Sequence, residues 1–207
     1  MDARRDDIRT RALQALRRFE VVMEGHFDYG NGYHGRLYLN PHQLLRYPST
    51  IWRVAQDLID MLPAGVTDTV TVVAGPATGG ALLAHTIAGL LDGRRPLTRE
   101  PYSFAPLHQR EPGGAPALSP FYAGVVKGAQ VLLVDDVRNT GQTLAHCAGL
   151  ITAAGGTVEA TAQIVDRAEA VVTLPVPNVS LVEYPAPDNH PAAACPMCAQ
   201  GMPISAF

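Results

Sequence analysis

The chain has 207 residues, 47% of them apolar, so it can bury one substantial core and is expected to form a single domain with a short appendage. Its formal net charge of −3 argues against a general nucleic-acid-binding surface, and no apolar run reaches membrane-spanning length. The N-terminal segment alternates Arg and Asp where a signal peptide would be apolar, and three cysteines are too few for a disulfide scaffold, which together predict a soluble protein of the reducing cytoplasm.

The N-terminal part predicts a helix followed by a hairpin. Apolar residues recur at a helical period over residues 4–23, and the interleaved Arg and Asp residues favour a solvated face over a nucleic-acid contact. Residues 25–41 are rich in Gly, Tyr and His with some apolar alternation, which predicts a mobile, hairpin-like segment. His26, His34 and His42 are expected there as surface residues of a loop.

Residues 49–62 predict an amphipathic core helix, with Ser49 as its cap and Pro63 as its end. A short strand around Val70–Val73 follows, then the side-chain-poor turn GPATGG at residues 75–80 and a helix over residues 81–91. Such a turn lets main-chain donors approach a polyanion, although it is also compatible with an ordinary tight connection between strand and helix.

The region after this helix predicts a further strand beginning at residues 96–98 and then a long loop. Residues 101–120 are rich in Pro and Gly and lack periodicity, which is typical of a functional lid or a disordered insertion. Arg99, His108 and Arg110 place cations in or beside that loop.

The stretch VLLVDDVRNTGQTL, residues 131–144, carries the strongest chemical pattern. Val131–Val134 predict a buried strand that ends in Asp135 and Asp136, and the turn at residues 139–143 opens a helix. Backbone N–H groups at a helix start bind phosphate, and adjacent carboxylates accept hydrogen bonds from sugar hydroxyls, so the layout fits a ribose 5-phosphate. A strand ending in paired aspartates also occurs in receiver-type signalling domains, but the Thr-Gly-x-Thr that follows favours the sugar-phosphate site.

A strand over residues 158–165 follows the central helix and ends in Asp166-Arg167. Successive strand–helix–strand units predict an α/β fold with a mostly parallel central sheet flanked by helices and a site at the strand ends. The guanidinium of Arg167 is suited to a planar anion, although an ion pair with its neighbour Asp166 is the alternative.

The tail, residues 185–207, contains His190, Cys195 and Cys198. These are zinc-ligand types with one C-x-x-C step, but a single step without a second pair is a weak zinc signal, and two reduced thiols are the competing interpretation.

Two of these motifs resemble one known family. The apolar run followed by D-D-x-x-x-T-G-x-T at residues 131–143 resembles the PRPP (5-phosphoribosyl 1-diphosphate) signature of type I phosphoribosyltransferases, and VAGPATGG at residues 73–80 resembles their orotate branch. The Gly- and Tyr-rich hairpin and the Cys-Pro-x-Cys tail are also similar to segments of orotate enzymes. The resemblance implies the type I fold over one domain, residues 1–207, with an N-terminal helix and hood at 1–45 and the tail at 185–207.

The resemblance also implies a role for each motif. Catalytic roles fall to Asp135, Asp136 and Arg99, of which Arg99 would start a basic loop over the pyrophosphate, commonly that of a neighbouring subunit. Base binding falls to Asn139 and to Arg167, which would hold the carboxylate of the base. PRPP binding falls to Gly75, Pro76, Ala77, Thr78, Gly79, Gly80, Asn139, Thr140, Gly141, Gln142 and Thr143.

The implied reaction transfers the phosphoribosyl group of PRPP to orotate, with Mg²⁺ bound mainly through PRPP and a homodimer as the assembly. Some orotate enzymes carry a Lys where Gly79 stands, and Arg138 and Asn139 replace residues that are usually small or hydroxylated. Another nucleobase, or a PRPP-sensing regulator without turnover, therefore stays open as an alternative.

Overall fold

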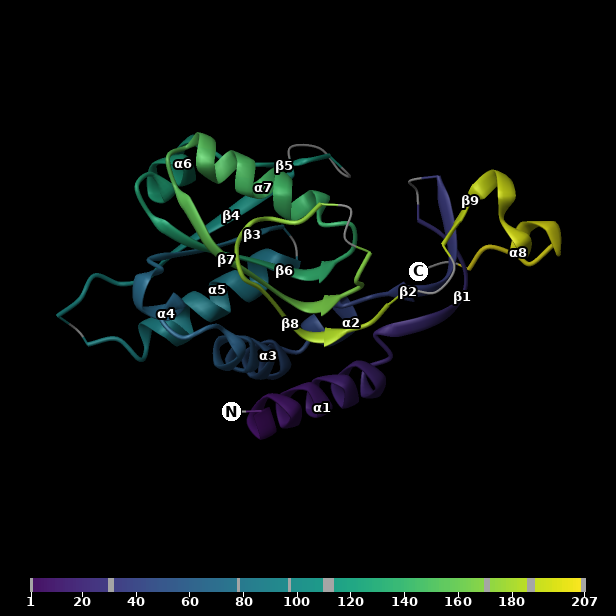
Figure 1. The fold of residues 1–207 in the computed structure, drawn as a ribbon, viewed down its shortest axis with the longest axis horizontal. Helices are drawn as coiled ribbons and strands as arrows, with labels where there is room; N and C mark the ends of the chain where they lie inside the picture. The colour runs from purple at the N-terminus through teal and green to yellow at the C-terminus, as the bar shows by residue number, and fades with distance from the viewer. Residues whose placement is uncertain are drawn as a thin grey trace.

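The computed structural model describes residues 2–29, 32–77, 79–96, 98–109, 114–169, 172–185 and 189–205. Its centre is a six-stranded sheet in the order β5-β4-β3-β6-β7-β8, in which all neighbours are parallel except β4 and β5 (Figure 1). The strands are β3 (Val72–Pro76), β4 (Ser103–Gln109), β5 (Pro116–Ala117), β6 (Gln130–Arg138), β7 (Thr157–Asp166) and β8 (Asn178–Glu183).

Helices cover both faces of this sheet, and each face has its own core. The helices are α1 (Asp2–Arg18), α2 (His42–Leu45), α3 (Pro48–Met61), α4 (Val66–Thr69), α5 (Gly79–Asp92), α6 (Pro120–Val126) and α7 (Gln142–Ala153). Side chains alternate along β6, so that Leu132 packs with α1, α3 and α5 while Val131 and Leu133 pack with α6 and α7. Within the described ranges, no helix is both long enough and apolar enough to cross a membrane.

A second, three-stranded antiparallel sheet, here called the hood sheet, lies beside the main body at the right of Figure 1. It consists of β1 (Val22–Asp28), β2 (Tyr33–Leu39) and β9 (His190–Pro191), and the tail continues from it through the 3-10 helix η1 (Ala192–Ala194) and α8 (Pro196–Ala199). The two ends of the described chain therefore lie far apart, since α1 packs under the main sheet and the tail packs on the hood sheet.

Several predicted elements are confirmed and several boundaries were wrong. The hairpin is confirmed, but His26 and His34 lie on its strands and are only 1% and 6% exposed, which contradicts their placement as surface residues of a loop. The first helix ends at Arg18, well before residue 23, because the strand β1 begins at Val22. Ser49 does not cap α3, whose N-cap is Tyr47 with Pro48 at the first helical position.

The region around residues 96–120 differs most from the prediction. No strand forms at residues 96 and 98, and Leu97 lies outside the described residues. The strand β4 instead occupies Ser103–Gln109, inside the segment expected to be a loop, and it pairs antiparallel with β5. The sequence did not predict this strand because Pro106 lies within it and proline argues against a central strand. The flanking residues Ala105 and Leu107 are nevertheless fully buried.

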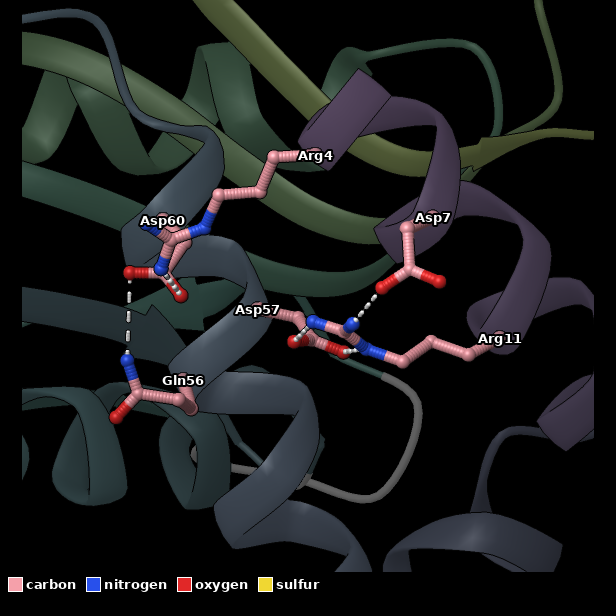
Figure 2. Close-up of polar contacts among 6 residues, drawn as sticks. All are labelled: Arg4, Asp7, Arg11, Gln56, Asp57 and Asp60. Atoms are coloured by element: carbon pink, nitrogen blue, oxygen red, sulfur yellow. Dashed lines mark hydrogen bonds and ion pairs between the residues drawn. The ribbon is translucent and has the colours of Figure 1, made fainter. Parts of the chain in front are cut away.

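The contact between α1 and α3 includes an ion pair whose carboxylate is buried and whose guanidinium is partly exposed (Figure 2). Arg11 Nε donates to Asp57 Oδ2 at 3.0 Å, and Arg11 Nη2 donates to the other oxygen of the same carboxylate. Asp57 is 8% exposed, whereas the neighbouring pair of Arg4 and Asp60 leaves 73% of the Arg4 side chain in solvent.

Asp57→Ala is therefore expected to destabilise the protein by about 1.5 to 3 kcal/mol, because two charge-assisted hydrogen bonds are lost together. Asp60→Ala is the matched control and should cost less than about 1 kcal/mol, because Arg4 donates one hydrogen bond to it and is more exposed than Arg11. Urea unfolding followed by circular dichroism measures both values, and equal losses in the two variants would contradict the assignment.

Candidate active site

Two adjoining cavities open at the carboxyl ends of β3 and β6. The first has a volume of about 550 Å³ and is lined by residues of the turn after β3, by Gln109 and by the start of α7. The second has a volume of about 840 Å³ and lies between β6, Arg167 and the hood sheet. His42, Asp136 and Gln142 line both cavities, so the two spaces meet at these side chains.

Asp136 lines both cavities, and the neighbouring Asp135 lines the first. Asp135 is 8% exposed, and its Oδ1 accepts the N–H of Asp136 at 2.9 Å. The Oδ1 of Asp136 accepts the N–H of Val137 at 2.7 Å. Burial raises the pKa of both groups, and the charge of Asp136 raises that of Asp135 further, while the Val137 N–H and His42 partly lower that of Asp136.

The turn after β3 brings bare backbone to these carboxylates. A Cβ atom at Gly75 would collide with the carbonyl of Gly80, and one at Gly80 would lie 2.7 Å from the carbonyl of Val134. A Cβ at Gly79 would collide with the Asp136 carboxylate itself. Only glycine allows this close approach of loop, helix start and strand. Pro76, Ala77 and Gly79 line the first cavity, and Thr78 lies outside the described residues.

The turn after β6 forms the opposite wall. Gly141 is the N-cap of α7 with φ +82°, a left-handed conformation that favours glycine, and the N–H of Val172 donates to the carbonyl of Thr140 at 3.0 Å. Gln142 and Thr143 line the first cavity, whereas Asn139 and Thr140 line the second. The start of a twelve-residue helix thus faces the space beside the aspartates, as an anion site requires.

Arg167 lies at the far end of the second cavity, 6% exposed. Its Nη2 is 3.1 Å from Glu169 Oε1, and its guanidinium carbon is 5.7 Å from the centre of the Tyr29 ring. Among the described residues, neither Nε nor Nη2 of Arg167 has a hydrogen-bond partner. Arg167 thus lines the cavity with a guanidinium whose Nη2 pairs with Glu169 and whose hydrogen-bonding capacity is not filled, and such a group is suited to bind a planar anion.

The alternative ion pair between Asp166 and Arg167 does not form. Asp166 Oδ2 instead accepts from Arg138 Nη1 at 2.7 Å and from Asn178 Nδ2 at 3.0 Å, and Asp166 Oδ1 accepts the N–H of Ala168. Arg138 also donates to the carbonyl of Val172 at 3.2 Å. Arg138 of the central motif therefore holds the end of β6 to Asp166 and Val172, and it lines neither of the two cavities.

Arg99 is the predicted site residue that the structure separates from the others. It is exposed, precedes β4 and lines a depression with Asp68 and Arg94, away from both cavities. The connection between α5 and β4 projects at the left of Figure 1, opposite the hood sheet. Within its own chain Arg99 does not reach the site, where Gln109 at the end of β4 lines the first cavity, so its role over the pyrophosphate of a neighbouring subunit stays a prediction. Arg110 lies outside the described residues.

Other cavity residues were missing from the prediction. His42 and His146 line the first cavity, and His146 Nε2 also contacts the Pro116 carbonyl at 2.8 Å. Tyr29, Tyr33 and Tyr38 of the hood sheet and Asn189 of the tail line the second. None of these residues belongs to a local motif, and the three tyrosines and Asn189 reach the site only because the hood sheet and its connections lie beside the main body.

Comparison with known proteins gives the class of protein to which this fold and these paired cavities belong. Residues 50–174 match the family model "Phosphoribosyl transferase domain". This chain therefore belongs to the phosphoribosyltransferase family, whose members are pentosyltransferases. The predicted α/β fold with a mostly parallel sheet is confirmed.

Within the family the chain is most like orotate phosphoribosyltransferases. It is 32% identical over 191 residues to the enzyme of Heliobacterium modesticaldum, a match that covers 92% of this chain and 93% of that one. The enzyme of Thermotoga maritima is 30% identical, with 92% and 93% covered. The crystal structure of orotate phosphoribosyltransferase from Aeropyrum pernix shares the fold, with a TM-score of 0.62, 23% identity, and 83% and 93% covered.

Proposed function

We propose that this enzyme transfers the 5-phosphoribosyl group of PRPP to orotate and releases orotidine 5'-monophosphate and pyrophosphate. The observation that carries the proposal is the buried guanidinium of Arg167, which lines the cavity next to Asp136 and whose Nε and Nη2 lack a well-aligned hydrogen bond, although Nη2 lies 3.1 Å from Glu169. Orotate is a planar base with a carboxylate, which a guanidinium binds through two parallel hydrogen bonds. The relatives named above, which bear the orotate name, support the same base.

Each wall of the site would hold one part of PRPP. The backbone of residues 139–143 at the start of α7 would bind the 5-phosphate, and Asp135 and Asp136 would accept hydrogen bonds from the ribose hydroxyls. The bare backbone of residues 75–77, 79 and 80 would approach the pyrophosphate. Positive charge develops on the ribose ring as pyrophosphate departs, so the chain would act by positioning and electrostatic stabilisation, without a covalent enzyme intermediate.

The donor set at the junction also fits Mg²⁺. Asp135 and Asp136 offer the hard oxygen ligands that Mg²⁺ prefers. Burial raises the pKa of both carboxyls, and a nearby cation would oppose that effect by favouring their charged forms. When bound with PRPP, Mg²⁺ would neutralise charge on the departing pyrophosphate.

The assay that tests the proposal uses PRPP, Mg²⁺ and a panel of bases, namely orotate, uracil, adenine, hypoxanthine and guanine. We expect pyrophosphate release with orotate and far less with uracil, which differs from orotate by the carboxylate that Arg167 would bind. Equal rates with the two pyrimidines would remove Arg167 from base recognition. PRPP binding in calorimetry without turnover on any base would favour a regulator that senses PRPP.

We also propose a cytoplasmic homodimer. The free thiols of Cys147, Cys195 and Cys198 suit a reducing compartment. A partner subunit could also bring Arg99, which does not reach the cavities of its own chain, to a neighbouring site. Light scattering after size exclusion gives the mass of the assembly and tests the dimer.

A further inference from the structure

Four side chains that are far apart in the sequence meet where the tail packs on the hood sheet. His26 lies on β1, His34 on β2, and Cys195 and Cys198 flank or belong to α8. One ligand atom from each lies within 4.8 Å of all the others. His190, which the sequence offered as a third ligand, is on β9 opposite His34 in backbone register and is not part of this group.

The spacing of the four atoms is that of a tetrahedral zinc site. Zinc bonds of about 2.3 Å to sulfur and about 2.05 Å to nitrogen, at tetrahedral angles, put sulfur and nitrogen roughly 3.6 Å apart and two nitrogens roughly 3.3 Å apart. Cys195 Sγ and Cys198 Sγ each lie 3.6 Å from His26 Nε2. Cys198 Sγ lies 3.3 Å from His34 Nδ1, and the two ring nitrogens are 3.0 Å apart.

The outer ring nitrogens of both histidines lie beside oxygen atoms, and the one of His26 is within hydrogen-bond distance. His26 Nδ1 lies 2.8 Å from the carbonyl of Met202, to which it can only donate, and His34 Nε2 lies 3.8 Å from Asp28 Oδ1. Because the Met202 carbonyl accepts the Nδ1 proton of His26, His26 Nε2 turns a lone pair toward His34 Nδ1, 3.0 Å away, and toward the two thiols. A carbonyl or carboxylate behind the imidazole is the usual outer partner of a zinc ligand.

The hood sheet and the tail have little apolar core of their own. Phe27 and Met197 are each 1% exposed, yet neither belongs to the two core clusters that stabilise the main sheet. Residues 22–39 and 189–205 thus form a unit of the size that usually needs a disulfide, a metal or an oligomer contact for stability. All three cysteines are free thiols, so no disulfide serves this purpose.

We propose that His26, His34, Cys195 and Cys198 form a structural zinc site that ties the C-terminal tail to the hood sheet. Two thiolates and two imidazoles complete a tetrahedral shell and select Zn²⁺ over the harder Mg²⁺. With four protein ligands the ion has no open position for substrate, so its role is to hold the structure together. The zinc site would also help to fix the wall of the second cavity, which is lined by Tyr29 after β1, Tyr33 on β2 and Asn189 before β9.

The test is the metal content of the whole chain, purified under reducing conditions without chelator and analysed by inductively coupled plasma mass spectrometry. We expect about one zinc per chain, as a closed four-ligand site requires. Replacing zinc with Co²⁺ should give the intense visible absorption of tetrahedral cobalt with thiolate ligands. Cys198→Ser, at the most exposed ligand, should lose most of the zinc and the cobalt spectrum.

His190→Ala is the matched control, because it changes a neighbouring histidine of the tail outside the group and should keep the full zinc content. A thiol reagent gives an independent readout. Burial, with a smaller effect from Asp135, raises the pKa of Cys147 to about 12, so reagent uptake in the folded chain reports on Cys195 and Cys198. Uptake should be low with zinc bound and rise after chelation.

Three results would overturn the site. They are a freshly purified chain without zinc that also takes up no cobalt, equal zinc content in Cys198→Ser and the wild type, and a Cys195–Cys198 disulfide found by peptide mass mapping. None of these measurements depends on transferase activity, so they stand apart from the proposed reaction.

Discussion

Asp136→Asn is expected to lower kcat by about 10²- to 10³-fold, the usual cost of removing one preorganised electrostatic contact at a reacting centre. The side chain stands where the two cavities meet and would face the ribose ring as charge develops. Asparagine keeps an oxygen that can accept the N–H of Val137, so the end of β6 should retain its geometry. The loss should therefore appear in steady-state kinetics with PRPP and orotate while the circular dichroism spectrum stays unchanged.

The same substitution is expected to raise the melting temperature at neutral pH. Burial raises the pKa of both Asp135 and Asp136 in the folded chain. A carboxyl with a raised folded pKa stabilises the fold below its unfolded pKa of about 3.9, and that contribution is lost as the pH rises through the folded pKa. Near neutral pH, Asp136→Asn removes a charge that the fold disfavours, whereas near about pH 3 the carboxyl is already neutral in both states and the difference should vanish.

A melting series from acid to neutral pH measures this dependence. Asp68→Asn, at an exposed position of α4, is the control and should change neither kcat nor the shape of the pH series. A gain in melting temperature of equal size at both ends of the series would show that ionisation is not its cause. An unchanged kcat would take Asp136 out of the catalytic site.

Arg167→Ala is expected to raise the KM for orotate at least about 30-fold, since removing one partner of a buried charge pair costs about 2 kcal/mol or more. The KM for PRPP should change far less, because the contacts proposed for its phosphate and ribose lie at Asp135, Asp136 and the start of α7, which line the first cavity. Arg167→Lys keeps the charge without the planar pair of donors, so its KM for orotate should lie between those of the wild type and Arg167→Ala.

Comparison with uracil sharpens this test. The penalty of Arg167→Ala should be much smaller for uracil, which lacks the carboxylate, than for orotate. Arg17→Ala is a control for the loss of a cation elsewhere and should leave the KM for orotate unchanged, because Arg17 is exposed at the end of α1 and lines neither cavity. An equal rise in the KM values of orotate and PRPP would indicate a general disturbance of the site.

The parts of this fold that the sequence predicts are those with local patterns. The helix at Pro48–Met61 has an apolar stripe at a helical period, and the strand ending in Asp135 and Asp136 is an apolar run followed by a glycine turn. Both patterns are properties of a few consecutive residues, so they can be read without knowing what packs against them.

The parts that the sequence does not predict depend on partners far along the chain. The strand β4 carries a proline at residue 106 and has no alternation, because both of its faces are buried. Arg138 pairs with Asp166, and His26 meets Cys195, across separations of 28 and 169 residues. Nothing near any of these residues identifies its partner, so the single C-x-x-C step was too weak alone to indicate a four-ligand group.

A substitution of Gly79 would require a change in the position of the Asp136 side chain, because the two residues are in close contact. Any side chain at residue 79 would occupy the place of the Asp136 carboxylate, which would have to rotate away from the Val137 N–H to make room. A lineage that acquired a lysine at residue 79 would gain a cation for the leaving group only together with a second change that resettled Asp136. A loop with glycine at residue 79 and a loop with lysine there therefore differ by at least two coupled substitutions. Gly79→Lys alone should displace the Asp136 carboxylate and lower activity.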